Sequence, residues 1–253
     1  MMTNSTSLID SLEVYVLNNP DETKPHWVSH FIVPTANELL IKIKNKNGNS
    51  GFGMATSYTD ISPIIKPFSN GLEDFIIGED PFCPEKIYEK IFKLTDTRIS
   101  SEKGWSKEAL IRISAALDIA CWDLVGKSLN IPLYKLFGGY RNKVPVYVTC
   151  GYYQEGKSES ELREELKKLI EIGHQSFKVK VGGLSIKDDA KRLEIVRDEI
   201  GQEKDLMIDV NRAWNLKTAI EGVKEFERFK PTWIEEPLRL SLIHISEPTR
   251  RRG

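Results

Sequence analysis

From residue 144 to residue 235, short apolar and β-branched segments alternate with longer segments whose apolar residues recur at helical spacing. Each strand and helix together span about 30 residues, which is typical of parallel βαβ construction. The pattern therefore predicts four parallel strands with three helices between them. The strands are expected at 144–150, 176–181, 205–210 and 232–235, and the helices at 158–172, 186–200 and 216–229.

The first part of the chain has a different pattern, which mixes strands and helices. Alternating apolar and polar residues predict a small antiparallel sheet. Its strands are expected at 8–17, 38–44 and 51–54. The polar loop at 18–34 separates the first two strands and carries three side chains that could bind a ligand, namely His26, Trp27 and His30.

Helical spacing of apolar residues predicts helices at 84–92 and 107–129. Ser106 is expected to cap the second helix, because its hydroxyl can accept a hydrogen bond from a free amide of the first turn. Gly138 and Gly139 end this region. We therefore predict an α+β domain over residues 1–140, followed by the βα units over residues 141–239.

The charge balance and the cysteines exclude several classes of protein. The formal net charge is −1, whereas proteins that bind nucleic acid or anionic membranes carry a basic excess. Cys83, Cys121 and Cys150 are too widely spaced for a disulfide framework or a CxxC metal knuckle. No apolar run approaches the roughly 20 residues that span a bilayer, and the first residues lack the features of a signal peptide. A reducing cytoplasm is the predicted location.

Charged and polar side chains lie at the carboxyl ends of two predicted strands. Lys178 and Lys180 are two residues apart on one strand, so they share a face, and so do Asp209 and Asn211 on the next. Two ammonium groups held close together disfavour each other's charge, which would lower at least one pKa and create a base. Taken alone, either pair is also compatible with a solvated strand face or a turn.

The predicted last strand ends in the sequence WIEEP. Adjacent strand residues point in opposite directions, so only one of Glu235 and Glu236 can face the same side as the lysines. Glu236 is expected to lie at the surface or behind the site. Carboxyl ends of parallel strands are where barrel enzymes build their active sites, so the three pairs together indicate one site.

The order KxK, DxN and WIEEP resembles the mandelate racemase and muconate lactonizing enzyme family of the enolase superfamily. The spacings agree with that family, since 209 − 178 = 31 and 235 − 209 = 26. The segment ALDIACWDLVGKSLNIPLYKLFGG resembles the family's passage from capping domain to barrel. The resemblance extends to about residue 239. It implies an α+β capping domain followed by an incomplete (β/α)8 barrel of the TIM type, with about four strands present.

The resemblance also implies roles for individual residues. Lys180 would remove the proton α to a carboxylate, and Lys178 would tune that base and help to neutralise the substrate carboxylate. Asp209 and Glu235 would be two ligands of a Mg²⁺ ion that stabilises the ene-diolate. Asn211 would contact the substrate. The loop at 18–34 resembles the family's capping loop, so its candidate side chains His26, Trp27 and His30 would read the distal end of the substrate.

The reaction favoured by the IEEP sequence is dehydration of an acid sugar. A racemase, an epimerase or a cycloisomerase on the same scaffold would use the same first step. The small-molecule substrate would be a carboxylate, and the full-length protein is expected to be a homo-oligomer. Two other readings are a barrel aldolase with Lys180 as a Schiff-base nucleophile, which leaves Asp209 and Glu235 without a role, and a non-enzymatic binding or oligomerisation module.

Residues 240–250 read LSLIHISEPTR and resemble the translation of a transposon sequencing adapter. We therefore expect residues 240–253 to be foreign to the natural protein and assign no role to His244. The family pattern requires a third acidic metal ligand on the next barrel strand, which would fall beyond residue 253. The chain as written is predicted to be an inactive fragment of an enzyme.

Overall fold

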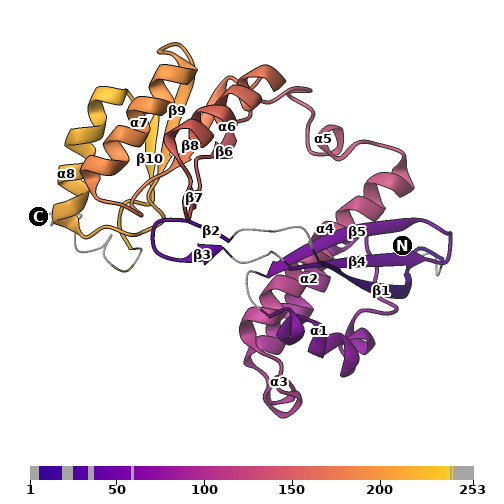
Figure 1. Ribbon diagram of the computed structural model, residues 1–253. Helices are drawn as coiled ribbons and strands as arrows, with labels where there is room; N and C mark the ends of the chain where they lie inside the picture. The colour runs from indigo at the N-terminus through magenta and orange to yellow at the C-terminus, as the bar shows by residue number, and fades with distance from the viewer. Residues whose placement is uncertain (1–5, 19–24, 34–36, 58–59, 240, 242–253) are drawn as a thin grey trace, which may run out of the picture. The chain divides into compact units, whose positions relative to one another are not determined.

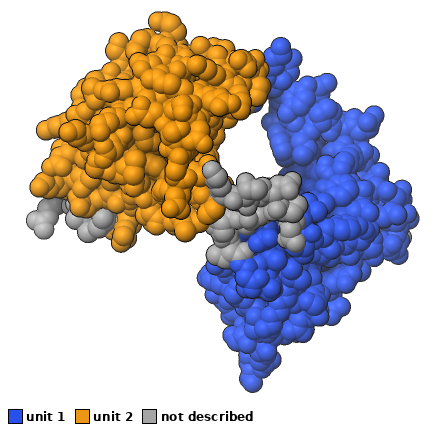
Figure 2. All heavy atoms as spheres, viewed as in Figure 1, with its two compact units in different colours: residues 1–21, 35–144 blue, residues 22–34, 145–253 orange. Residues whose placement is uncertain are grey.

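The computed structural model describes residues 6–18, 25–33, 37–57, 60–239 and 241 (Figure 1). The chain forms two compact units, which Figure 2 colours separately. Unit 1 contains residues 1–21 and 35–144, and unit 2 contains residues 22–34 and 145–253. Within the described part of the chain, no helix combines the length and the apolar character needed to cross a bilayer.

Unit 1 contains the predicted antiparallel sheet of three strands. The strands are β1 (Ile9–Asn18), β4 (Asn37–Asn45) and β5 (Ser50–Ser57), in the order β1-β4-β5. Leu39, Ile41 and Ile43 alternate along β4 and are fully buried on one face. This confirms the alternation seen in the sequence.

The helices of unit 1 are only partly those predicted. They are α1 (Ser62–Ser69), α2 (Pro84–Lys93), α3 (Arg98–Lys103), α4 (Lys107–Leu129) and α5 (Leu133–Leu136), with 3₁₀ turns at Glu73–Phe75 and Leu94–Asp96. The predictions for α2 and α4 are confirmed, and Ser106 caps α4 by accepting a hydrogen bond from the Ala109 amide at 3.1 Å. Helix α1 was not predicted because Pro67 lies inside it.

Helix α4 packs directly on β5 at two glycines. A Cβ atom added at Gly51 would lie 2.0 Å from the carbonyl oxygen of Ala120, and one at Gly53 would lie 1.8 Å from that of Ala116. These distances are far below any van der Waals contact with backbone atoms. The two glycines therefore set how closely the helix approaches the sheet.

We expect Gly53→Ala to destabilise unit 1 by at least about 2 kcal/mol, because the new methyl group can fit only if α4 moves away from β5. Urea unfolding followed by circular dichroism measures the change. Met54→Ala is the matched control, because the Met54 side chain is 49% exposed on the other face of the same strand. Equal stability losses in the two variants would contradict this account of the packing.

Unit 2 contains the predicted parallel sheet. Its strands β6 (Val148–Cys150), β8 (Ser176–Lys180), β9 (Asp205–Asp209) and β10 (Trp233–Glu235) follow one another in the order β6-β8-β9-β10. The connecting helices are α6 (Glu159–Ile172), α7 (Ile186–Ile200) and α8 (Leu216–Phe226), and α8 ends in a 3₁₀ turn at Glu227–Phe229. The prediction of parallel βα units is confirmed. Strand β6 is shorter than predicted, since Val144 and Val146 are 69% and 68% exposed.

Each helix of unit 2 begins at a side-chain cap. Ser158, Ser185 and Asn215 accept hydrogen bonds from amides in the first turns of α6, α7 and α8. The buried core of the unit lies between these helices and the sheet, with Phe177 and Phe226 as its largest fully buried side chains. The carboxyl ends of the four strands thus open on one side of a packed sheet.

The segment predicted as a loop at 18–34 contains two short strands, so that prediction is wrong in part. Strands β2 (His26–Trp27) and β3 (Ile32–Val33) form a hairpin, and β2 also pairs with β7 (Tyr153–Gln154), just beyond β6. Main-chain pairing between segments so far apart in the chain leaves no periodic signal in two-residue strands. Residues 19–24 and 34 lie outside the described part of the loop, as do residues 240 and 242–253 of the C-terminal segment.

Candidate active site

The two lysines of β8 lie on one face and meet the carboxylate of Asp209. Lys180 Nζ lies 2.7 Å from Asp209 Oδ2, and Lys178 Nζ lies 3.5 Å from the same oxygen. The side chains of Lys178, Lys180 and Asp209 are only 10%, 9% and 2% exposed. The solvated strand face that the KxK spacing also allowed is therefore wrong. Buried charges of this kind require partners, and here they supply them to one another.

Strand register places three of the candidate residues in one row. Lys180 pairs with Asp209 across β8 and β9, and Asp209 pairs with Glu235 across β9 and β10. Lys178 Nζ lies 3.1 Å from Glu235 Oε1, and Lys180 Nζ donates to Asn211 Oδ1 at 3.1 Å. The structure thus brings together all five residues that the strand-end motifs predicted.

The turn after β9 places the Asn211 side chain beside Lys180. The Asn211 amide donates to Asp209 Oδ1 at 3.0 Å, and the residue has a φ of +50°, in the left-handed region that asparagine tolerates better than most residues. Glu236 points away from the row and pairs with Arg212 at 3.4 Å, both side chains being well exposed. This agrees with the expected surface position of Glu236.

The pKa of Lys178 lies above its usual value. Burial lowers it, but the hydrogen bond to Glu235 and the charge of Asp209 raise it more. The shift is opposite to the one expected from a neighbouring ammonium group alone, because two carboxylates complete the cluster.

Asp209 and Glu235 fit the requirements of two ligands for a hard divalent cation. Among the described residues, no three His, Cys, Asp or Glu side chains gather closely enough to hold a metal ion. However, the Lys178 ammonium lies within 3.5 Å of Asp209 and 3.1 Å of Glu235, so both carboxylates can reach one positive charge. Carboxylate oxygens are the donors that Mg²⁺ prefers.

Two tyrosines that were not anticipated lie against the lysines. The ring centre of Tyr147 is 5.1 Å from Lys178 Nζ, and that of Tyr152 is 5.5 Å from Lys180 Nζ. Tyr147 also meets Trp233 edge-on at 5.7 Å. An aromatic face attracts an ammonium group and keeps water from one side of it. Tyr147 and Tyr152 flank β6 in the sequence, and this is the sequence feature from which the contacts could have been predicted.

The three candidates from the β2–β3 segment lie in different surroundings. His26 meets the Tyr152 ring edge-on at 5.0 Å, so it is one ring away from Lys180. Trp27 stacks on Tyr153 with ring centres 6.0 Å apart. His30 is exposed and lies 3.0 Å from the Ser29 hydroxyl, at the edge of an open hollow of about 350 Å³. None of the described contacts joins His30 to the lysines.

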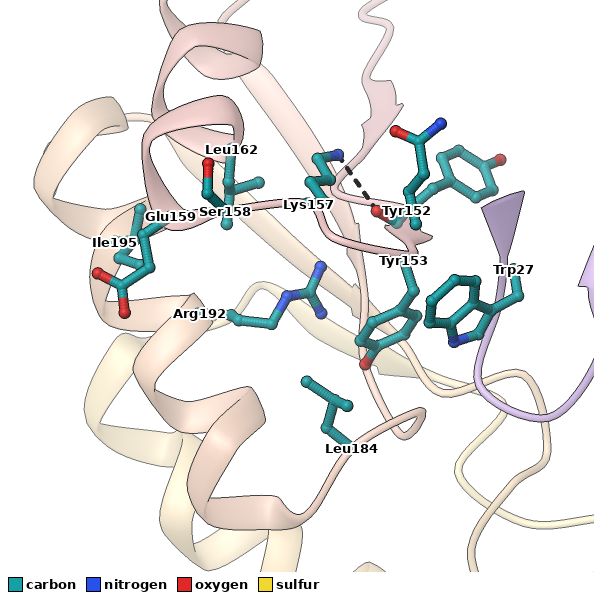
Figure 3. A pocket seen from close by; sticks show the side chains of 11 residues that line it. Trp27, Tyr152, Tyr153, Lys157, Ser158, Glu159, Leu162, Leu184, Arg192 and Ile195 are labelled. Carbon is teal, nitrogen blue, oxygen red and sulfur yellow. Dashed lines mark hydrogen bonds between the residues drawn. The ribbon is translucent and has the colours of Figure 1, made fainter. Parts of the chain in front are cut away.

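A separate cavity of about 220 Å³ lies between the β7 segment, the start of α6 and α7 (Figure 3). Trp27 and Tyr153 form one wall, and Arg192 reaches in from α7 toward the Tyr153 ring. Its lining includes none of the five strand-end residues. The cavity therefore lies outside the lysine and carboxylate cluster, although Tyr152 borders both.

Burial raises the pKa of the Cys121 and Cys150 thiols to about 12, whereas Cys83 is exposed. Below that pKa the neutral, unreactive thiol predominates. At pH 8 we therefore expect Ellman's reagent to label Cys83 rapidly. We expect it to label Cys121 and Cys150 only after the protein unfolds. Mass spectrometry of the labelled chain measures this. Rapid labelling of Cys150 in the native protein would show that the end of β6 is open to solvent.

The amino-acid sequence matches two described domain families. The N-terminal domain of mandelate racemase and muconate lactonizing enzymes matches residues 11–138, and the enolase C-terminal domain-like family matches residues 161–249. The second match includes most of the segment expected to be foreign, so the origin of that segment stays a prediction.

Individual relatives point the same way. The chain is 29% identical to arabinonate dehydratase of Saccharolobus solfataricus, covering 82% of this chain and 54% of that protein. It is 34% identical to L-talarate/galactarate dehydratase of Salmonella typhimurium, covering 79% and 48%. The chain thus spans about half the length of these relatives.

A crystal structure of a racemase from Streptomyces coelicolor with bound magnesium superposes with a TM-score of 0.79. The sequence identity is 26%, and the match covers 92% of this chain and 63% of that one. The predicted fold, a capping domain followed by an incomplete barrel, is confirmed.

Proposed function

Because the chain belongs to the mandelate racemase and muconate lactonizing enzyme family of the enolase superfamily, we propose that its protein removes a proton α to a carboxylate with the help of Mg²⁺. The observation that carries this proposal is the row of Lys180, Asp209 and Glu235 across three adjacent strands. A base and two metal-binding carboxylates at the carboxyl ends of parallel strands are the parts that such a reaction needs.

Each residue of the site has a proposed role that follows from its charge or its hydrogen-bonding groups. Lys180 accepts the α-proton, and Lys178 places a second positive charge where the substrate carboxylate gains electron density. Asn211 contacts the substrate beside Lys180. Asp209 and Glu235 would hold the Mg²⁺ ion, which would supply Lewis-acid stabilisation of the negative charge that develops on the substrate carboxylate.

The favoured overall reaction is dehydration of an acid sugar. Proton transfer from the α-carbon to Lys180 is followed by loss of the β-hydroxyl group, which takes up a proton from a general acid and leaves as water, and the resulting enol tautomerises to a 2-keto acid. The dehydratases of S. solfataricus and S. typhimurium support this choice. The magnesium-bound racemase structure favours the second candidate, in which a proton returns to the same carbon.

The wall of the substrate site is proposed to include the aromatic side chains around the lysines. Tyr152 lies beside Lys180 and His26 lies against the Tyr152 ring, so both are proposed to contact the part of the substrate beyond the reacting carbon. Trp27 and His30 remain proposed specificity residues. A homo-oligomeric assembly, a cytoplasmic location and the lack of a nucleic-acid partner remain predictions.

A panel of aldonate and aldarate sugars tests the proposed function. The full-length protein that is expected to contain this chain, called the native protein below, is incubated with each sugar and Mg²⁺, and the 2-keto acid product is measured as its semicarbazone. We expect product with at least one sugar, and none after chelation of divalent cations. Product that is insensitive to chelation, or borohydride trapping of a carbonyl substrate on Lys180, would favour the metal-independent aldolase instead.

A further inference from the structure

A buried ion pair lies behind the lysines. Arg192 Nη1 is 3.2 Å from Asp189 Oδ1, and the two side chains are 15% and 0% exposed. Asp189 Oδ1 also accepts a hydrogen bond from the Tyr153 hydroxyl at 2.6 Å, and Oδ2 accepts one from the Gly182 amide at 2.7 Å. Every contact of this carboxylate is therefore made with groups that border the end of β8.

Arg192 joins the ends of β6 and β8 where their main-chain pairing stops. The last paired residues are Cys150 and Val179, after which Gly151 turns away with a φ of +65°. The guanidinium then donates to the Gly151 carbonyl at 2.6 Å and to the Lys180 carbonyl at 3.0 Å. One planar side chain thus replaces the strand-to-strand bonds at the residue that carries the proposed base.

Tyr153 completes this arrangement from the other side. Its hydroxyl accepts a hydrogen bond from the Gly183 amide at 3.0 Å, and its ring centre lies 4.1 Å from the Arg192 guanidinium, as Figure 3 illustrates. Burial and the charge of Asp189 raise the pKa of Tyr153, so the hydroxyl keeps its proton and donates a hydrogen bond to Asp189. The backbone on both sides of Val181 is held by this network.

We propose that Arg192, held by Asp189 and Tyr153, is a positioning residue that fixes the end of β8 and so the point from which Lys180 reaches Asp209 and Asn211. This inference rests on the proposed function in that Lys180 is taken as the base. Arg192 itself touches none of the reacting groups.

Arg197 offers a matched control on the same helix. Arg197 is buried, and its guanidinium donates to the carbonyls of Phe229, Lys230, Gly201 and Lys204. These carbonyls lie where β9 and β10 begin, at the opposite end of the strands from Lys180. A purely structural role predicts similar consequences for Arg192→Lys and Arg197→Lys, because a lysine cannot bridge several carbonyls in either place.

The test measures amide hydrogen exchange at 181–183, together with kcat and KM on an acid sugar that the protein accepts. We expect Arg192→Lys to speed exchange at Gly182 and Gly183 by about fivefold or more, the effect of losing an ordinary hydrogen bond. We also expect it to lower kcat by about 10- to 100-fold with little change in KM, since small displacements of a catalytic group are that costly. Arg197→Lys should leave exchange at these amides unchanged and kcat within about twofold.

Tyr153→Phe removes a single hydroxyl group and provides a milder variant if Arg192→Lys does not fold. We expect it to speed amide exchange at Gly182 and Gly183 and to lower kcat, each by less than Arg192→Lys does. Equal effects of the Arg192 and Arg197 variants on exchange and kcat, or unchanged exchange at 181–183 in both Arg192→Lys and Tyr153→Phe, would overturn the inference. If the native protein turns over no acid sugar, the proposed function fails and the catalytic role of Arg192 fails with it. Amide exchange then still decides whether Arg192 holds the end of β8.

Discussion

Replacing Lys180 by methionine is expected to slow removal of the substrate α-proton by roughly 10²- to 10⁴-fold, the usual contribution of a positioned general base. Methionine keeps an unbranched chain of similar length but cannot accept a proton. Because Lys180 donates to both Asp209 and Asn211, the variant also removes one hydrogen-bond donor from each of these two side chains. The rate is measured on the acid sugar that gives product with the native protein.

Lys191→Met is the matched control for this substitution. Lys191 lies on α7, its side chain is 58% exposed, and its ion-pair partner is Asp188 at the surface. The control should therefore retain the native rate. If Lys180→Met were as active as Lys191→Met, Lys180 would not be the base.

The largest effect on stability is expected for Asp209→Ala, at about 3 kcal/mol. The carboxylate is almost fully buried and is shared by the two lysine ammonium groups. Removing it leaves two buried positive charges beside each other with fewer partners, which costs far more than the loss of an exposed pair. Urea unfolding of the metal-free protein measures the change.

Asp188→Ala serves as the control for the loss of a carboxylate. Asp188 is 51% exposed and pairs with Lys191, so its removal should destabilise the protein far less than removal of Asp209. The double variant Asp209→Ala, Lys180→Met should be less destabilised than the sum of its single changes, because it removes both partners of one pair. Additive losses would show that the Lys180–Asp209 contact contributes little.

The sequence allowed the central part of the site to be predicted because strand geometry is regular. Residues two apart on a strand share a face, and the helices between parallel strands bring the carboxyl ends to one side. The motifs around Lys178, Asp209 and Glu235 therefore had to lie near one another once the strands were identified. The distances between these residues and the ion pairs that they share could not be predicted, because they depend on the register of the strands in the structure.

The contacts that were missed depend on segments far apart in the chain. The pairing of β2 with β7 joins residues 26–27 to residues 153–154 and leaves no periodic pattern. Arg192 and Asp189 look like ordinary charged residues of an amphipathic helix, yet Asp189 is fully buried and the Arg192 side chain is only 15% exposed beside the end of β8. Side chains that are charged but buried against main-chain groups cannot be recognised from helical periodicity, which marks only the apolar face.

Loss of the proton from the carbon beside the substrate carboxylate tests the central claim most directly. The protein and a substrate are placed in D₂O with Mg²⁺, and the α-proton signal is followed by NMR together with product formation. The account predicts that the α-proton is lost with the native protein, and that this loss requires both Mg²⁺ and Lys180. Loss of the α-proton at the same rate with Lys180→Met, or without a divalent cation, would contradict it.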